Sequence, residues 1–172
     1  SLNPRQRIGQ LLDAPLRLNT SLEPAEREQR INQTLRQVGM LPDHAYYYPH
    51  MLASGQKQRV ALARALILQP KVIVADEALA SLDMSMRSQI INLMLELQEK
   101  HGISYIYVTQ HLGMMKHISD QVLVMHEGEI VERGSTAEVL AAPLHELTKR
   151  LIASHFGEAL TADAWRRDGG RF

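Results

Sequence analysis

The sequence predicts an α/β fold, and three observations support it. Short apolar runs rich in β-branched residues occur at residues 72–75, 103–108 and 122–125, as in buried strands. A wide apolar stripe of helical spacing, from Met86 to Leu97, lies between the first two runs. The resulting order of strand, helix and strand implies a right-handed parallel crossover. We expect the strand at residues 72–75 to be buried on both faces.

The N-terminal part of the chain is predicted to be helical. Apolar residues at helical spacing begin at Ile8, and a second helix opens at Pro24, a residue suited to a first turn. Gly39 is expected to end this second helix. A third helix, rich in alanine and leucine, is predicted over residues 55–68, before Pro70.

The C-terminal part is predicted to contain a hairpin and two helices. Gly128 lies in a tight turn between the strand at residues 122–125 and a returning strand at residues 130–131. Helices are expected near residues 136–141 and 144–155.

The composition excludes several classes of protein. The chain has 172 residues, 45% of them hydrophobic, so it can bury a core. Lysine plus arginine equals aspartate plus glutamate, 19 each, which argues against a basic nucleic-acid surface. The absence of cysteine excludes disulfides and Cys-ligated zinc. No apolar run approaches the ~20 residues that span a bilayer, so we expect any membrane association to run through a partner. The chain opens without an initiator methionine, and we expect it to be a piece of a longer protein.

Two adjacent carboxylates, Asp76 and Glu77, follow the strand at residues 72–75. In open parallel sheets, ligands bind beyond the carboxyl ends of the strands. One carboxylate there can bind Mg²⁺, because hard cations prefer oxygen ligands. The other can orient and deprotonate an attacking water. The alternative is a strand that ends in solvated charges.

Further polar residues flank this strand. Small residues at positions 52–56 (Leu-Ala-Ser-Gly-Gln) open the third helix, where backbone N–H groups favour an anion. The alternative there is a plain N-cap by Ser54. Downstream, Asp83 follows the carboxylates and His111 follows the next strand. His111 would lie beside Glu77 if the two strands are neighbours, although a lone histidine is more often structural.

In this order, the motifs resemble those of the ATP-binding-cassette (ABC) ATPases, over residues 1 to about 135. The matching segments correspond to the signature loop and its helix, the Walker B strand, the D-loop and the switch histidine: Leu52-Ala53-Ser54-Gly55-Gln56-Lys57-Gln58-Arg59, Ala63-Arg64-Ala65-Leu66, Val72 to Glu77, Ser81-Leu82-Asp83 and His111. Four ordered motifs at the family's spacing make the resemblance specific. The opening residues 1–5 and the stretch from 83 to 134 resemble the oligopeptide/dipeptide importer subfamily.

The resemblance implies a RecA-like P-loop NTPase fold whose N-terminal part is missing from this sequence. Residues 1–70 would form the helical (signature) subdomain, residues 71–135 the C-terminal part of the ATPase core, and residues 136–172 a helical extension. It also implies ATP and Mg²⁺ as cofactors.

Roles for individual residues are likewise implied by the resemblance. Glu77 would be the general base, His111 a catalytic contact to the γ-phosphate, and Asp76 a ligand of Mg²⁺. The residues implied to bind nucleotide are Ala53, Ser54, Gly55, Gln56 and Asp83, the last of which would also connect the two sites of a dimer.

The implied function is that of an ATP-hydrolysing motor subunit of a transporter for peptides. Its partners would be a second ABC ATPase subunit and transmembrane permease subunits, with no nucleic acid. Residues 1–50 are the candidate surface for the permease. The implied location is the cytoplasmic face of the bacterial inner membrane.

The sequence departs from the family in two places. The 172 residues contain no G-x-x-x-x-G-K-[ST] phosphate loop, so we expect this chain alone to bind ATP weakly and to hydrolyse it negligibly. In the signature, Ala53 replaces a serine that contacts the γ-phosphate, and a lost hydrogen bond to a charged group costs roughly 1.5–3 kcal/mol. Ser54 replaces a glycine, which adds about 1 kcal/mol of strain if the position needs a positive φ. We therefore expect a composite site of reduced activity.

Two alternative functions remain open at this point. The first is a soluble ABC ATPase of DNA repair or translation, against which the balanced charge and the importer-like opening count. The second is a non-catalytic interaction module, which the missing phosphate loop supports for this chain.

Overall fold

The computed structural model describes residues 2–156, in two compact units that divide the chain into Ser1–Val108 and Thr109–Phe172. Residue 1 and residues 157–172, which belong to the predicted C-terminal extension, lie outside the described part. In chain order, the first unit contains α1 (Ile8–Asn19), α2 (Pro24–Gln37), the 3₁₀ helices η1 (Pro42–Tyr46) and η2 (Pro49–Met51), α3 (Ser54–Leu66), β1 (Val72–Asp76), α4 (Met84–His101) and β2 (Ser104–Val108). The second unit contains α5 (Leu112–Ile118), β3 (Gln121–His126), β4 (Glu129–Ser135), α6 (Thr136–Ala141) and α7 (Glu146–Phe156).

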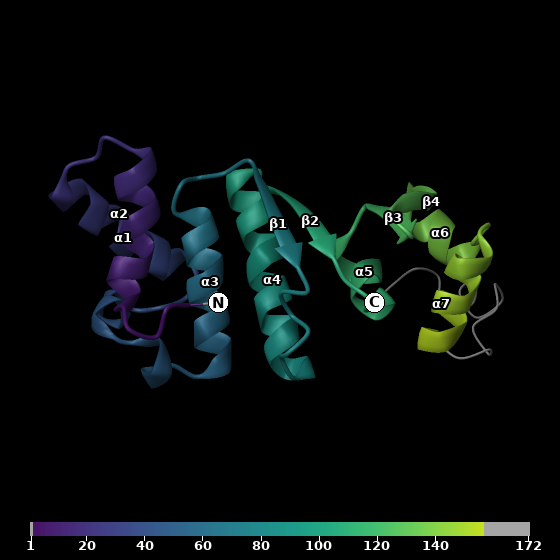
Figure 1. Ribbon diagram of the computed structural model, residues 1–172, viewed down its shortest axis with the longest axis horizontal. Helices are drawn as coiled ribbons and strands as arrows, with labels where there is room; N and C mark the ends of the chain where they lie inside the picture. Colours follow the sequence, from purple (N-terminus) through teal and green to yellow (C-terminus); the bar gives the residue numbers. More distant parts are fainter. Residues whose placement is uncertain (1, 157–172) are drawn as a thin grey trace. The chain divides into compact units, whose positions relative to one another are not determined.

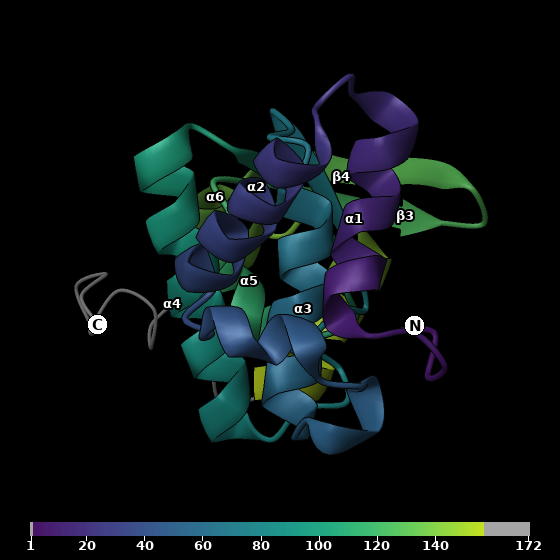
Figure 2. The ribbon, with the colours of Figure 1, turned by 90° about the vertical axis from the view of Figure 1, so that its left-hand side faces the viewer.

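The helices α1, α2 and α3 pack together in the first unit (Figures 1 and 2). Their apolar faces supply fully buried side chains such as Leu12, Leu35 and Val60. An ion pair of 2.7 Å between Arg27 Nε and Asp13 Oδ1 joins α2 to α1. The three N-terminal helices predicted from the sequence are thereby confirmed, each within a few residues of its expected bounds.

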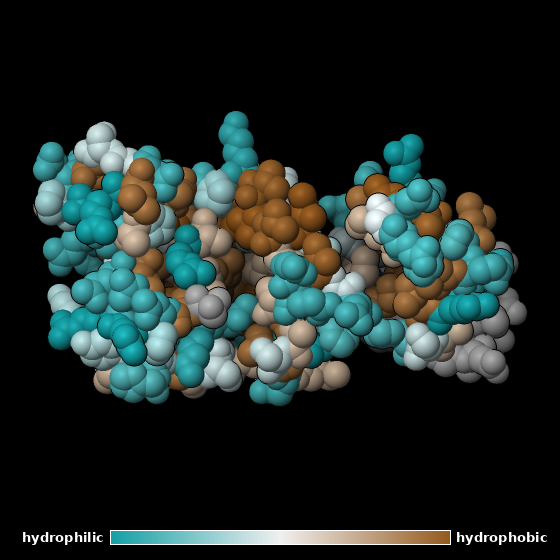
Figure 3. Space-filling view, in the orientation of Figure 1, coloured by the Kyte–Doolittle hydropathy of each residue, from teal (hydrophilic) through white to brown (hydrophobic). Residues whose placement is uncertain are grey.

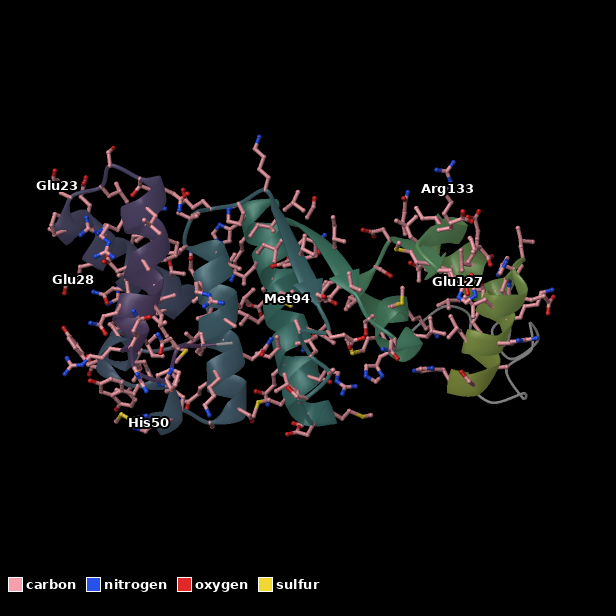
Figure 4. All side chains as sticks on the ribbon, viewed as in Figure 1. Glu23, Glu28, His50, Met94, Glu127 and Arg133 are labelled. Atoms are coloured by element: carbon pink, nitrogen blue, oxygen red, sulfur yellow. The ribbon has the colours of Figure 1, made fainter. Side chains whose placement is uncertain are left out.

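The strands β1 and β2 pair in parallel and are connected by α4, as the sequence predicts. The register places Val72 opposite Ser104 and Asp76 opposite Val108. One face of the pair packs against α4, where the Tyr107 hydroxyl donates a hydrogen bond of 3.0 Å to the Met94 sulfur. Figure 4 labels Met94 on this helix.

The prediction that β1 is buried on both faces is wrong for the described structure. Val72 and Val74 are 50% and 64% exposed, and on β2 Ile106 and Val108 are 54% and 50% exposed. Because side chains alternate along a strand, these four residues share the face opposite α4. Apolar atoms gather on the surface over β1 and β2 (Figure 3). The reason is that a single helical layer covers only one face of a two-stranded sheet.

The second unit is built around the hairpin of β3 and β4, which confirms the predicted hairpin. Its turn residues Glu127 and Gly128 have φ angles of 48° and 85°, the pattern of a type I′ turn. The core of the unit consists of Val122, Val124 and Val139. Side chains from α5 and α7 pack against it. The helices α6 and α7 match the predicted helical segments, whereas the short helix α5 was not predicted from the sequence. Within residues 2–156, no helix is both long and apolar enough to cross a membrane.

Candidate functional site

The two candidate carboxylates lie at the carboxyl end of the parallel strand pair. Asp76 is the last residue of β1 and is exposed, and Glu77 follows it half-buried. The Glu77 N–H donates to the Val108 carbonyl at 2.9 Å, which continues the strand pairing one residue beyond β1. The structure thus places both carboxylates at the edge of the sheet where the sequence predicts them.

Glu77 has an unusual backbone conformation, with a φ of 44°. A left-handed conformation at a non-glycine residue costs about 1–2 kcal/mol and persists only where its surroundings hold it. The segment that follows is held by two hydrogen bonds. The Ala80 N–H donates to the Glu77 carbonyl at 3.2 Å, and Gln58 Nε2 donates to the Ala78 carbonyl at 2.6 Å.

The predicted anion-binding helix start is formed by α3. Ala53 occupies the N-cap position, its N–H donates to Gln56 Oε1 at 3.0 Å, and no side chain caps the helix. Because the alanine methyl group cannot accept a hydrogen bond, the first backbone N–H groups of α3 lack a side-chain acceptor. The alternative of an N-cap by Ser54 is therefore wrong. Ser54 also avoids a positive φ, so the strain considered for this position does not arise.

Gly55 and Asp83 are both structural partners of Met86, at the start of α4. A Cβ atom on Gly55 would lie 2.9 Å from the Met86 Cγ and Cε atoms. Asp83 is the N-cap of α4, since its Oδ1 accepts the Met86 N–H at 2.9 Å. The helix start at Gly55 and the loop at Asp83 thus contact the same residue, Met86, through its side chain and its backbone N–H respectively, whereas their nucleotide-binding roles stay predictions.

His111 lies in the second unit, at the N-cap position of α5. It is half-buried, and its N–H donates to Thr109 Oγ1 at 3.1 Å. Its ring stands edge-on to that of His155 on α7, with 6.1 Å between the centroids. A cleft shared by His111 and Glu77 stays a prediction, because these residues belong to different units.

The first unit offers some, but not all, of the groups that would bind a magnesium nucleotide. The uncapped start of α3 can accept an anionic phosphate, and the exposed Asp76 carboxylate suits a hard cation. Among residues 2–156, no three histidine, aspartate or glutamate side chains are grouped to hold a metal ion. Mg²⁺ at Asp76 would therefore complete its coordination with water and phosphate oxygens, as this cation commonly does.

Sequence reasoning did not single out Glu132, a carboxylate only 9% exposed on β4. Its oxygens accept the N–H groups of Leu144 and His145, at 2.8 and 2.9 Å, just before α7. Burial raises its pKa, but this is outweighed by the buried Thr148 hydroxyl beside it, the two N–H donors and the charge of His145, so the pKa lies below its ordinary value. The hairpin also carries Glu127, Glu129 and Arg133, so nothing in the sequence separates Glu132 from a solvated charge.

Comparison with known proteins relates the chain to ABC transporters. A protein-family model described as ABC transporter matches residues 1–80. The "Putrescine export system ATP-binding protein SapF" of Escherichia coli K12 and the "Peptide transport system ATP-binding protein SapF" of Salmonella typhimurium are each 82% identical over 98% of this chain. The chain spans 63% of the length of each of these two relatives. The "Dipeptide transport ATP-binding protein DppF" of E. coli K12 is 42% identical over 90% of the chain, which covers 46% of that protein.

The chain resembles ABC transporter ATP-binding proteins over nearly its whole length. A solved ABC structure confirms the predicted fold class. It is the ATP-binding cassette MJ0796, in a dimeric post-hydrolysis state bound to ADP and Pi, with a TM-score of 0.67 and 26% identity. The match covers 79% of this chain and 59% of the cassette. The resemblance to ABC ATPases implies nucleotide binding.

Proposed function

We propose that the parent protein is the ATP-hydrolysing motor subunit of an ABC transporter for peptides and drives their uptake. The observation that carries the proposal is the pair of carboxylates at the end of β1, with Glu77 held in a strained conformation. Strained backbone is concentrated at functional sites, and an acid pair at this sheet edge suits metal-nucleotide chemistry. The names of the relatives favour a transporter over a soluble ATPase of DNA repair or translation.

In the proposed mechanism, each polar residue has one role. Asp76 holds Mg²⁺, directly or through water, and the Glu77 carboxylate accepts a proton from the attacking water. His111 contacts the γ-phosphate. It follows Val108 by three residues, so its Cα lies at most about 11 Å from that strand end. When bound, the magnesium nucleotide supplies the phosphoanhydride bond that the water cleaves.

The remaining predicted contacts of this chain would be made to the nucleotide of a second cassette, which faces the first head to tail. The start of α3, at Ala53, Ser54, Gly55 and Gln56, would close on the nucleotide bound by this second subunit, and Asp83 would connect the two sites. Permease subunits would dock on residues 1–50, at the cytoplasmic face of the inner membrane. We also propose the division into parts at residues 1–70, 71–135 and 136–172.

The test of the proposal is the Glu77→Gln substitution in the full-length parent, assembled with its transporter. We expect ATP hydrolysis to fall by roughly 10²- to 10⁴-fold, because a general base contributes about that much, while nucleotide binding persists. The matched control is Glu99→Gln, which neutralises an exposed carboxylate on α4. Hydrolysis that survives Glu77→Gln, or an equal loss in Glu99→Gln, would refute the role of Glu77. The 172-residue chain alone, assayed in parallel, should bind ATP weakly.

A second candidate function is putrescine export, which the name of the E. coli K12 relative favours. The two are separated by transport in sealed vesicles that contain the complete transporter. Peptide accumulation driven by ATP supports uptake. ATP-driven loss of labelled putrescine from the cytoplasmic side supports export instead.

A further inference from the structure

The strained backbone at Glu77 raises the question of what holds it. Among the described residues, the other non-glycine positions with positive φ are Gln69 and Glu127. Glu127 lies in a hairpin turn that requires this conformation. Glu77 instead ends a parallel strand, where no turn type imposes a positive φ. Besides the local bond from the Ala80 N–H to the Glu77 carbonyl, contacts from other elements hold this segment.

Two such contacts lie on opposite sides of the residue. On the strand side, the Val108 carbonyl of β2 accepts the Glu77 N–H at 2.9 Å. On the helix side, Gln58 Nε2 of α3 donates to the carbonyl of Ala78, the next residue, at 2.6 Å. Gln58 is half-buried, and its amide reaches across twenty residues of sequence to the acid-bearing segment. This short, partly buried hydrogen bond constrains the direction of the peptide that follows Glu77.

The position of Gln58 in α3 gives this contact a further consequence. Gln58 lies four residues after Ser54, the first residue of the helix, and therefore one turn further along nearly the same face. The helix start is the predicted contact to the nucleotide held by the opposing cassette. A rigid helix thus connects the predicted phosphate contact to the backbone of the predicted general base, within one unit of one chain.

We propose that Gln58 is a positioning residue that holds Glu77 in its left-handed conformation and couples that conformation to the start of α3. This inference rests on the proposed function and adds to it a link between the two nucleotide sites through a single chain. A ligand that shifts α3 moves the Gln58 amide, and with it the direction of the Glu77 carboxylate. Coupling of this kind needs one discrete contact that both sites bias.

The first test uses Gln58→Leu in the 172-residue chain and requires no nucleotide. Leucine keeps a similar size and lacks the donor. A strong NMR cross-peak between the amide proton and the Hα of Glu77 reports a positive φ, and we expect it to weaken in the variant. Hydrogen exchange at the Glu77 amide should become roughly two- to tenfold faster, in line with the loss of one hydrogen bond. The matched control is Gln89→Leu, which removes an exposed amide from α4.

A second variant keeps the test decisive if Gln58→Leu does not fold. Gln58→Glu keeps the size and polarity of the side chain but, when ionised, offers no donor to the Ala78 carbonyl. It should change the Glu77 signals in the same direction. An unchanged cross-peak and exchange rate in a folded variant would overturn the inference.

The second test measures ATP hydrolysis by the full-length parent. We expect Gln58→Leu to lower kcat by about ten- to a hundred-fold, as for a misplaced catalytic group, with KM nearly unchanged. Altered Glu77 signals together with an unchanged kcat would overturn the positioning role. The proposed function is tested separately, since it fails if a Glu77→Gln variant still hydrolyses ATP. The NMR measurement does not depend on hydrolysis, so the two failures can be told apart.

Discussion

At the scale of single residues, the start of α3 lies where the sequence predicts a helix start, and its role as a functional motif stays a prediction. The sequence predicts that the helix start faces an anion, and the absence of a side-chain cap at Ala53 agrees with this. That Gly55 packs beside Met86 could not be predicted, because the two residues lie about thirty positions apart in the chain, on different helices.

Substituting Gly55 tests this packing. In Gly55→Ala, the new Cβ would overlap the Met86 side chain, and overpacking of this kind costs about 1–3 kcal/mol. The gain in helix propensity, about 1 kcal/mol, offsets part of the cost. We expect a net loss of stability in urea unfolding, which Met86→Ala in the same chain relieves.

The control for this prediction is Gly113→Ala, a helical glycine of α5 with nothing within 4 Å of its added Cβ. It should be neutral or slightly stabilising. A Gly55→Ala chain that is as stable as Gly113→Ala would contradict the packing account.

The departure at Ala53 makes a second prediction at this scale. In the full-length transporter, Ala53→Ser restores a hydroxyl at the predicted γ-phosphate contact. Since such a bond is worth roughly 1.5–3 kcal/mol, we expect nucleotide to bind the composite site about ten- to a hundred-fold more tightly, with a faster ATPase rate. The comparison is with Ala65→Ser, an exposed alanine further along the same helix. No gain in rate would remove support for a site of reduced activity.

At the scale of elements, helices and strands were largely predictable, while the contacts that hold them together were not. The spacing of the apolar residues indicates α4, which buries one stripe of its surface, and the hairpin, whose strands bury one face. The attachment of α7 depends instead on Glu132, whose carboxylate accepts hydrogen bonds from the N–H groups of Leu144 and His145, about a dozen residues further along the chain. Hydropathy patterns carry no information on such a pairing.

Glu132 should stabilise the second unit in a pH-dependent manner. Its folded-state pKa lies below the ordinary value, so its contribution is complete above the unfolded-state pKa and is lost as the pH falls through the folded-state pKa. We expect Glu132→Gln to cost about 1.5–3 kcal/mol near neutral pH. Measured by urea unfolding from about pH 7 to about pH 3, this difference should shrink towards acid.

The matched control is Glu129→Gln, an exposed carboxylate on the same strand. It should change stability little at any pH. A cost of Glu132→Gln that stays constant across the pH range would show that shape, and not charge, holds the start of α7.

At the scale of the whole molecule, the exposed apolar face of β1 and β2 is the main departure from expectation. Four exposed residues, Val72, Val74, Ile106 and Val108, lie on it. Contiguous exposed apolar surface favours association. The 172 residues span 63% of the length of the SapF relatives, and in a longer parent further chain could cover this face.

The chain by itself should therefore self-associate through this face. We expect Val74→Lys to shift the chain towards the monomer in sedimentation velocity at several concentrations, because burying a lysine ammonium in an apolar contact is unfavourable. Leu18→Lys, at a 78% exposed position on α1, controls for the added charge. Equal shifts in the two variants would mean that net charge, and not this face, governs association.

The sequence alone determined the α/β class, most of the order of the elements and the resemblance to ABC ATPases, because hydrophobic period and motif spacing are local properties of the chain. It also located the acid pair, since the end of an apolar strand is visible in one dimension. Only the tertiary structure decided which face of β1 is covered, that Glu77 adopts a positive φ, and that Gln58 and Glu132 hold distant segments. These features depend on contacts between residues far apart in the chain, and long-range pairing is set by packing and not by periodicity.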